Sequence, residues 1–161
     1  MAPADPKRLK VADRFVTILK NITAGDNYFF TPLEVVKHYV FPEEAACIKD
    51  RPVYSVYPEG SGGSFSDKTG GVYAEIYPLV VHGIVENPVD TVGDLEKAVR
   101  DVRKAVEADS RDESSGALGD LCINVSIASP PETDGGVFSG IGRGYFSQEF
   151  MIHVSGLVTE L

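Results

Sequence analysis

Apolar residues recur at intervals of three and four in two stretches of the chain, residues 5–22 and residues 91–109. This spacing places one apolar stripe along a helix and leaves the charged residues on its other side. The sequence therefore predicts two amphipathic helices. The apolar stripe of the second helix consists of Val92, Leu95, Ala98, Val99, Val102, Ala105 and Val106.

The residues at the predicted helix starts are typical caps. Asp5 is expected to cap the first helix, with Pro6 in its first turn. Thr91 is expected to be the N-cap of the second helix, and Asp94 would complete a capping box with it.

The charges of the second helix are spaced for pairing along its solvent side. Glu96 precedes Arg100 by four residues, and Lys97 precedes Asp101 by the same interval. Such pairs contribute only a few tenths of a kcal/mol each, about 0.2–0.5. We interpret these charges as a solvated outer face.

Strand patterns flank both predicted helices. Residues 121–128 alternate apolar and polar side chains, which is typical of a sheet with one buried face. Further strands are expected at 31–41, 52–57 and 72–86, with Pro78 and Gly83 as bulge or edge positions, and within 137–158. These patterns predict an α+β fold, in which a small antiparallel or mixed β-sheet packs against two main amphipathic helices.

Three polar stretches separate these elements. Residues 59–71, EGSGGSFSDKTGG, contain five glycines and three serines and predict a flexible hairpin connection or a partly disordered loop. Residues 110–119 are expected to form a second loop, and residues 129–136 a wide turn.

Length and charge restrict the class of protein. A chain of 161 residues, 43% of them hydrophobic, is expected to form one domain, residues 1–161, with a substantial core. The net charge of −9 argues against a nucleic-acid groove, and it would serve solubility or repel DNA that passes nearby. No apolar run is long enough to span a membrane, and the first ten residues lack the apolar region of a secretory signal.

Cysteine and histidine spacing gives no specific metal signal. Cys47 and Cys122 are far apart and are interpreted as reduced, partly buried thiols of a cytosolic protein, with a disulfide or a metal site as the alternative. His38, His82 and His153 each lie on a predicted strand and lack the short spacing of zinc ligands. We expect no metal.

Glycine motifs give no cofactor site either. Residues 63–69 have the length of a phosphate-binding loop, but Asp67 replaces its second glycine. The run from Gly140 to Gly144 resembles part of a dinucleotide fingerprint, yet it lies in a strand-rich region. No Gly-x-Ser-x-Gly elbow occurs, and no pair among the 24 carboxylates is singled out. We expect no catalytic residue and no cofactor, so the chain is not predicted to be an enzyme.

Three runs carry a resemblance to a known family: ADRFV at 12–16, VVHGIV at 80–85, and residues 95–109 with the pattern Leu-x-x-Ala-Val-x-Asp-Val-x-x-Ala. In this order, with a Gly-rich hairpin between the first two runs, the chain resembles the tail terminator (tail completion) proteins of long-tailed bacteriophages. The resemblance covers most of the chain and is one of architecture.

The resemblance implies a structural virion protein at the head-proximal end of the tail, assembled in the host cytoplasm. Subunits of this family form a hexameric ring that caps the tail tube, stops its polymerisation and provides the surface for head–tail joining. The implied partners are the major tail tube protein and a head-completion or connector protein. DNA would pass through the ring without specific binding.

Glycine content and polarity select two segments, 61–70 and 130–143, as the faces of such a ring. The candidate interface residues are Ser61, Gly62, Gly63, Phe65, Lys68, Val137, Phe138, Ile141 and Arg143. The alternatives are another head–tail connector or tail tube component, or a small acidic α+β binding module or enzyme.

Overall fold

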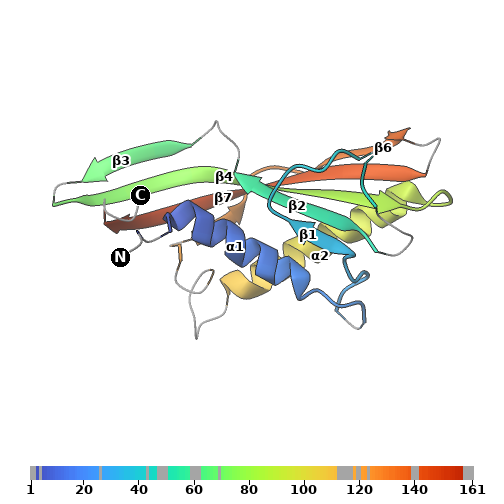
Figure 1. The fold of residues 1–161 in the computed structure, drawn as a ribbon, viewed down its shortest axis with the longest axis horizontal. Coiled ribbons are helices and arrows are strands. Elements are labelled where there is room, and N and C mark those ends of the chain that lie inside the picture. Colours follow the sequence, from blue (N-terminus) through green and yellow to red (C-terminus); the bar gives the residue numbers. More distant parts are fainter. Residues whose placement is uncertain are drawn as a thin grey trace.

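A mixed sheet of seven strands and two helices make up the part of the chain that the computed structural model describes (Figure 1). The structure describes residues 3, 5–25, 27–42, 44–46, 51–58, 63–68, 70–111, 118, 121, 122, 124–138 and 142–157. The predicted α+β fold is confirmed. The elements are α1 (Lys7–Lys20), β1 (Glu34–Val36), β2 (Val53–Pro58), β3 (Ser64–Lys68), β4 (Val72–Glu86), α2 (Thr91–Ser110), β5 (Asn124–Ile127), β6 (Glu132–Phe138) and β7 (Arg143–Leu157).

Two long antiparallel strands, β4 and β7, form the centre of the sheet. They pair along their whole length, from Val72 opposite Leu157 to Glu86 opposite Arg143. On the outer edge of β4, β2 pairs with residues 79–84 and β3 pairs with residues 72–76. On the outer edge of β7, β6 pairs with residues between 143 and 147, and β5 pairs with residues 150–153. β1 extends the sheet beyond β2 and pairs with it in parallel.

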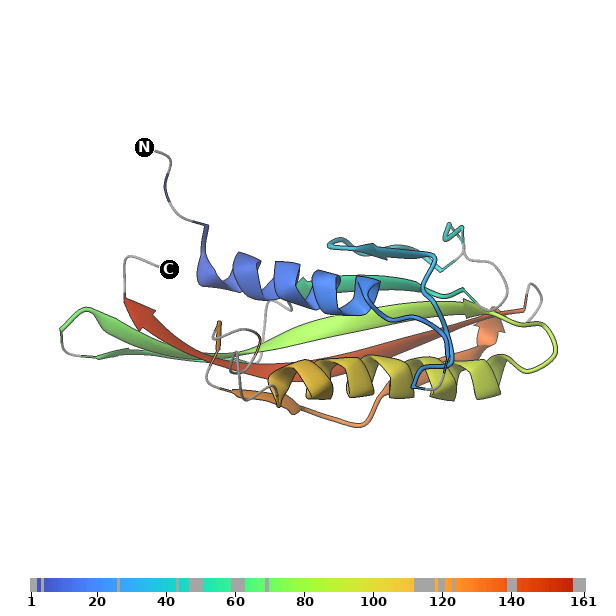
Figure 2. The ribbon, with the colours of Figure 1, turned by 90° about the horizontal axis from the view of Figure 1, so that it is seen from below.

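Both helices lie side by side on one face of the sheet and run in opposite directions (Figure 2). Alternate residues of β7 point to this face and are buried, as their spacing predicts. The ring of Phe15 in α1 meets Phe150 of β7 edge to face at 5.5 Å. The core on this side includes Val11, Phe15, Leu19, Tyr54, Tyr77, Leu79, Leu95, Val102, Phe146, Phe150 and Ile152.

The first turn of α2 sits directly on β7 at Gly144. A Cβ atom at this position would lie 2.5 Å from Cγ2 of Thr91 and 2.8 Å from Cδ1 of Leu95. Only glycine therefore allows the helix to approach the strand this closely.

The other face of the sheet is partly covered by residues on both sides of β1 in the chain. Leu33, Val40 and Ala45 pack there with Val53 of β2 and Ile84 of β4. The strand predicted at 31–41 is therefore wrong beyond Glu34–Val36, because the chain leaves the sheet edge to bury these apolar side chains.

Two predicted loops contain strands. Within residues 59–71, β3 pairs with β4, and Gly70 and Gly71 form the turn between them with φ of +92° and +75°. These glycines supply a backbone conformation that other residues rarely adopt. The wide turn predicted at 129–136 is replaced from Glu132 onward by β6. Of the loop predicted at 110–119, Ser110 still belongs to α2, and residues 112–117 and 119 lie outside the described residues.

No bulge occurs at Pro78 or Gly83, because the register between β4 and β7 is continuous through both residues. Pro78 lies at the gap between β2 and β3, where neither strand pairs with β4.

The predicted helix caps are also wrong. α1 starts after Pro6, which makes no side-chain cap bond. The N-cap of α2 is Asp90, whose carboxylate accepts a hydrogen bond of 3.0 Å from the amide of Gly93. Asn87 stabilises the turn before this cap, because its side-chain oxygen accepts a hydrogen bond of 3.1 Å from the amide of Asp90. Thr91 instead donates its hydroxyl to the carbonyl of Asn87.

Asp101 overturns the interpretation of the α2 charges as a solvated face. Its side chain is fully buried, and its carboxylate accepts hydrogen bonds from the amides of Phe29, at 2.9 and 3.1 Å, and Phe30, at 3.0 Å. Burial raises the pKa of this carboxyl, while the two amides and the charges of Arg100 and Lys104 oppose that shift. Asp101 thus ties the connection between α1 and β1 to α2.

The predicted i,i+4 pairs do not form either. Lys97 lies 3.6 Å from the carboxylate of Asp94, and the guanidinium of Arg100 lies over the ring of Phe29, 5.1 Å from its centroid. The charges on this side of α2 therefore interact with the segment that Asp101 binds.

Replacing Asp101 by alanine should lower the free energy of unfolding by about 2–4 kcal/mol, because the part-buried amide of Phe29 and the buried amide of Phe30 lose their acceptor. Urea denaturation followed by circular dichroism measures this loss. Glu96→Ala, at an exposed position of the same helix, is the control and should change stability by less than about 0.5 kcal/mol. Equal losses in the two variants would contradict the role given to Asp101.

Candidate interaction surfaces

The residues selected from the sequence fall at opposite ends of the sheet. Gly63, Phe65 and Lys68 lie at β3, beside Val72–Tyr77, whereas Val137 and Phe138 lie in β6 next to Arg143, at the other end of β7. At about 3.3 Å per residue, the fifteen residues of β7 separate these groups by roughly 45 Å. Ser61, Gly62 and Ile141 lie outside the described residues. The described candidates therefore form two surfaces.

The first surface is an arm made of β3, residues 72–76 of β4 and residues 153–157 of β7. The arm extends beyond the ends of both helices (Figure 2). Its outer strand, β3, pairs with β4 on one side and with no second strand in the described part of the chain. An unpaired strand edge of this kind is a template for pairing with another chain.

Two large apolar side chains are exposed on the arm. Phe65 of β3 is 55% exposed and stacks on Tyr73 at 5.9 Å, and Leu157 of β7 is 56% exposed. The alternation of β7 places Leu157 on the face of the sheet away from both helices. An exposed apolar group beside an open strand edge is typical of an interaction site.

At the opposite end, the side chain of Arg143 makes contacts within the chain. Its Nη1 donates a hydrogen bond of 2.8 Å to the carbonyl of Pro42, and its Nε lies 3.5 Å from the carboxylate of Glu86. The side chain is 14% exposed. These contacts fasten the start of β7 to the segment that covers the sheet, and an interface role for Arg143 stays a prediction.

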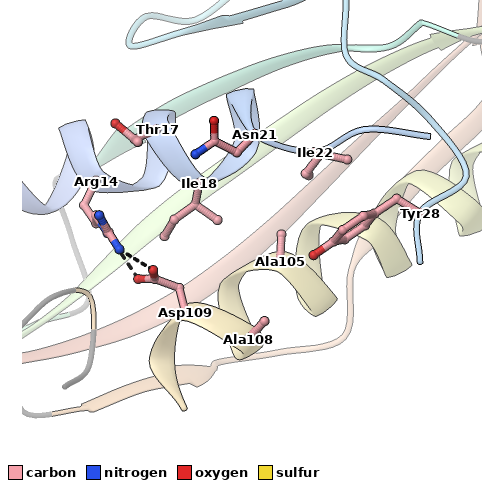
Figure 3. A pocket seen from close by; sticks show the side chains of 9 residues that line it. All are labelled: Arg14, Thr17, Ile18, Asn21, Ile22, Tyr28, Ala105, Ala108 and Asp109. Carbon is pink, nitrogen blue, oxygen red and sulfur yellow. Dashed lines mark hydrogen bonds and ion pairs between the residues drawn. The ribbon is translucent and has the colours of Figure 1, made fainter. Parts of the chain in front are cut away.

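A groove of about 290 Å³ separates α1 from the second half of α2 (Figure 3). Ile18, Ile22 and Ala105 lie along it, and an ion pair between Arg14 and Asp109 closes one end at 2.5 and 3.3 Å (Figure 3). A two-pronged arginine–carboxylate contact fixes both orientation and distance. We assign the groove a structural role in joining the two helices.

His82 lies in an aromatic cluster on the face of the sheet away from the helices. Its ring stacks on Tyr57 at 4.7 Å, meets Tyr39 edge to face at 5.5 Å and lies 5.0 Å from Tyr145. Nε2 shares a hydrogen bond with the Tyr57 hydroxyl. Burial lowers the pKa of His82 to about 4, so the ring is neutral at pH 7.

Sequence reasoning considered His82 only as a metal ligand. Within the described part of the chain, no group of three histidine, cysteine, aspartate or glutamate side chains is arranged to hold a metal ion. The signal that could have indicated a buried cluster is the position of His82 inside the apolar run of β4.

The thiol of Cys122 is in a poor environment for reaction. Burial and the negative charge of Asp109 raise its pKa to about 11, against the opposing charge of Lys7. A thiol that stays protonated at neutral pH is a weak nucleophile. Cys47 lies outside the described residues.

No protein-family model matches the chain, and no curated protein matches it in sequence. Among the described residues, neither helix has the length and apolar content needed to cross a membrane.

The burial of neutral His82 should make stability depend on pH. Between about pH 6.5 and pH 4 the unfolded chain binds a proton at this residue and the folded chain does not. Stability should therefore fall as pH falls through this window, by at most about 1.4 kcal/mol per pH unit, and this contribution should be constant above it.

Urea denaturation of the native chain and of His82→Gln at pH 7.5, 6.5, 5.5 and 4.5 isolates this contribution. The difference in unfolding free energy between the two proteins removes the titrations that they share. The unfolding free energy of the native chain should fall relative to that of His82→Gln as pH falls below 6.5. A difference that stays constant over the series would refute a neutral, buried His82.

Proposed function

We propose that this chain is a structural subunit of a ring of the phage tail terminator type. The observation that supports this best is the arm, which carries an unpaired strand edge and two exposed apolar side chains beyond the helices. Surfaces of this kind serve association. The described interface candidates lie on the arm, at β3, and at the far end of β7.

The placement of the strand edges favours a head-to-tail contact. β3 pairs with β4 at one end of the sheet. β6 pairs with β7 at the other end, on the opposite edge of the central strand pair. Two different surfaces meeting between identical subunits give a heterologous interface, which closes into a ring when the rotation per subunit allows it. In the proposed ring, β3 of one subunit adds to the β6 edge of the next by main-chain hydrogen bonds.

Phe65 would be the anchor of this contact. Aromatic side chains near the centre of an interface contribute a large share of the binding free energy. Leu157 lies on the opposite face of the arm from Phe65 and belongs to a separate apolar contact. A stable contact buries about 800 Å² per partner, so the strands and neighbouring side chains must all take part.

The charge of the chain fits the passage of DNA through a ring. With −9 charges per subunit, a ring of six copies would repel the phosphate backbone, so DNA could pass without being held. The two faces of the ring would contact the major tail tube protein and a head-completion or connector protein.

Association is tested by size-exclusion chromatography with light scattering and by negative-stain electron microscopy. The native chain should form rings, with a mass near six subunits. Phe65→Ser should weaken association by at least tenfold, because it removes an aromatic anchor. Val92→Ser, a substitution at a 63%-exposed apolar residue of α2, is the matched control and should leave the mass unchanged.

A chain that stays monomeric at every concentration, with and without tube protein, would refute the proposal. Tail capping is tested separately by adding the purified chain to polymerising tube protein from the same genome. Native protein should shorten the tubes, and Phe65→Ser should do so less. Equal shortening by both would place the tube contact away from the arm.

A further inference from the structure

A polar cavity of about 260 Å³ opens on the sheet face away from the helices. Strand register brings its walls together. Tyr57 of β2 lies opposite Val80, His82 lies opposite Ser147 of β7, and Glu132 of β6 pairs with the same serine. Glu149 follows two residues later on the same face of β7.

The charge inside this cavity is uncompensated. Glu132 and Glu149 occupy diagonal positions on neighbouring strands, because Glu132 pairs with Ser147. The described residues that line the cavity include no lysine and no arginine. Like charges at such positions on a sheet repel each other. A bound cation would remove this repulsion.

The ring of His82 lines the cavity. His82 is only 7% exposed, and its buried Nδ1 has no hydrogen-bond partner among the described residues. An unpaired buried polar atom costs about 1–3 kcal/mol. Nδ1 has less than 1 Å² of accessible surface, so a ligand in the cavity would contact the ring of His82 and not this atom.

Aromatic rings complete the environment. The ring centroid of His82 lies 4.7 Å from that of Tyr57 and 5.0 Å from that of Tyr145. Organic cations bind the faces of such rings, with a gain of about 0.5–2 kcal/mol.

We propose that this cavity binds an alkylguanidinium or alkylammonium group. The two glutamates supply charge, and the aromatic rings supply cation–π contact. The volume lies just below the range of about 300–1,000 Å³ typical of pockets for drug-sized ligands. It suits a group the size of one basic side chain. The group comes from a small free amine or from a lysine or arginine of another chain.

The site does not depend on ring formation and is tested on the full-length chain. Butylguanidinium and butylammonium are titrated into ¹⁵N-labelled protein, and amide shifts are followed by NMR. Butylurea, which has a similar shape and no charge, is the matched ligand control. Saturable shifts near His82, Tyr145 and Glu149 with either cation, and none with butylurea, are expected.

Variants separate this site from general attraction to an acidic protein. Glu149→Gln and Glu132→Gln should each weaken cation binding at least fivefold. Glu96→Gln, which removes one charge from the exposed side of α2, should leave it unchanged. Glu132 is exposed, so Glu132→Gln should disturb the fold less than Glu149→Gln. Circular dichroism verifies that both variants are folded.

Non-saturable shifts, binding of butylurea as tight as that of the cations, or equal weakening in all three variants would overturn the proposal. Light scattering identifies the source of the natural cation. If excess butylguanidinium converts an oligomer to single chains, another copy supplies the group. If the mass does not change, the site takes a cation from outside the assembly, and ring formation is judged by its own experiments.

Discussion

The antiparallel pairing of β4 with β7 is the contact on which the rest of the structure depends. Fifteen consecutive residue pairs fix which side chains of both strands face the helices and which face away. A shift of one residue would exchange the two faces and move every apolar side chain of the core to the other side. All other described strands attach to the outer edges of this pair or, as β1 does, to β2. The arm, the aromatic cluster and the cavity are consequences of where those shorter strands begin and end.

The two faces of the sheet are stabilised by different physics. Apolar packing against α1 and α2 covers one face, and Asp101 supplements it with a buried charge that is satisfied by backbone amides. The other face is covered only in part, by a short apolar cluster around Val53 and Ile84 and by the aromatic rings around His82. Buried charges are retained only when they are fully hydrogen-bonded, and on the first face that condition is met. The second face has an open cavity lined by Glu132 and Glu149, which makes this face the more suitable one for a ligand.

Periodicity predicted the two helices and the long strands correctly because many residues contribute to each pattern. It failed where a single long-range contact decides the structure. Asp101 has the spacing of a surface charge, and only the position of Phe29 and Phe30, more than seventy residues earlier, makes it a buried anchor. β3 was interpreted as part of a loop because Gly70 and Gly71 resemble a flexible linker, whereas they form a tight turn. The predicted interface residues were chosen by composition, which selected Phe65, whose side chain is exposed, but also Arg143, whose side chain serves an internal contact.

The central strand pair has a consequence for the order of folding. Its partners are separated by 57 residues at the near end and by 85 at the far end, with α2, β5 and β6 between them. During synthesis, β4 therefore leaves the ribosome well before β7 exists, and its apolar residues must wait without their partner. Closing so long a loop is slow compared with forming the helices. Until β7 is made, an apolar strand with one open edge is exposed, so aggregation and chaperone binding are expected to compete with folding in this interval.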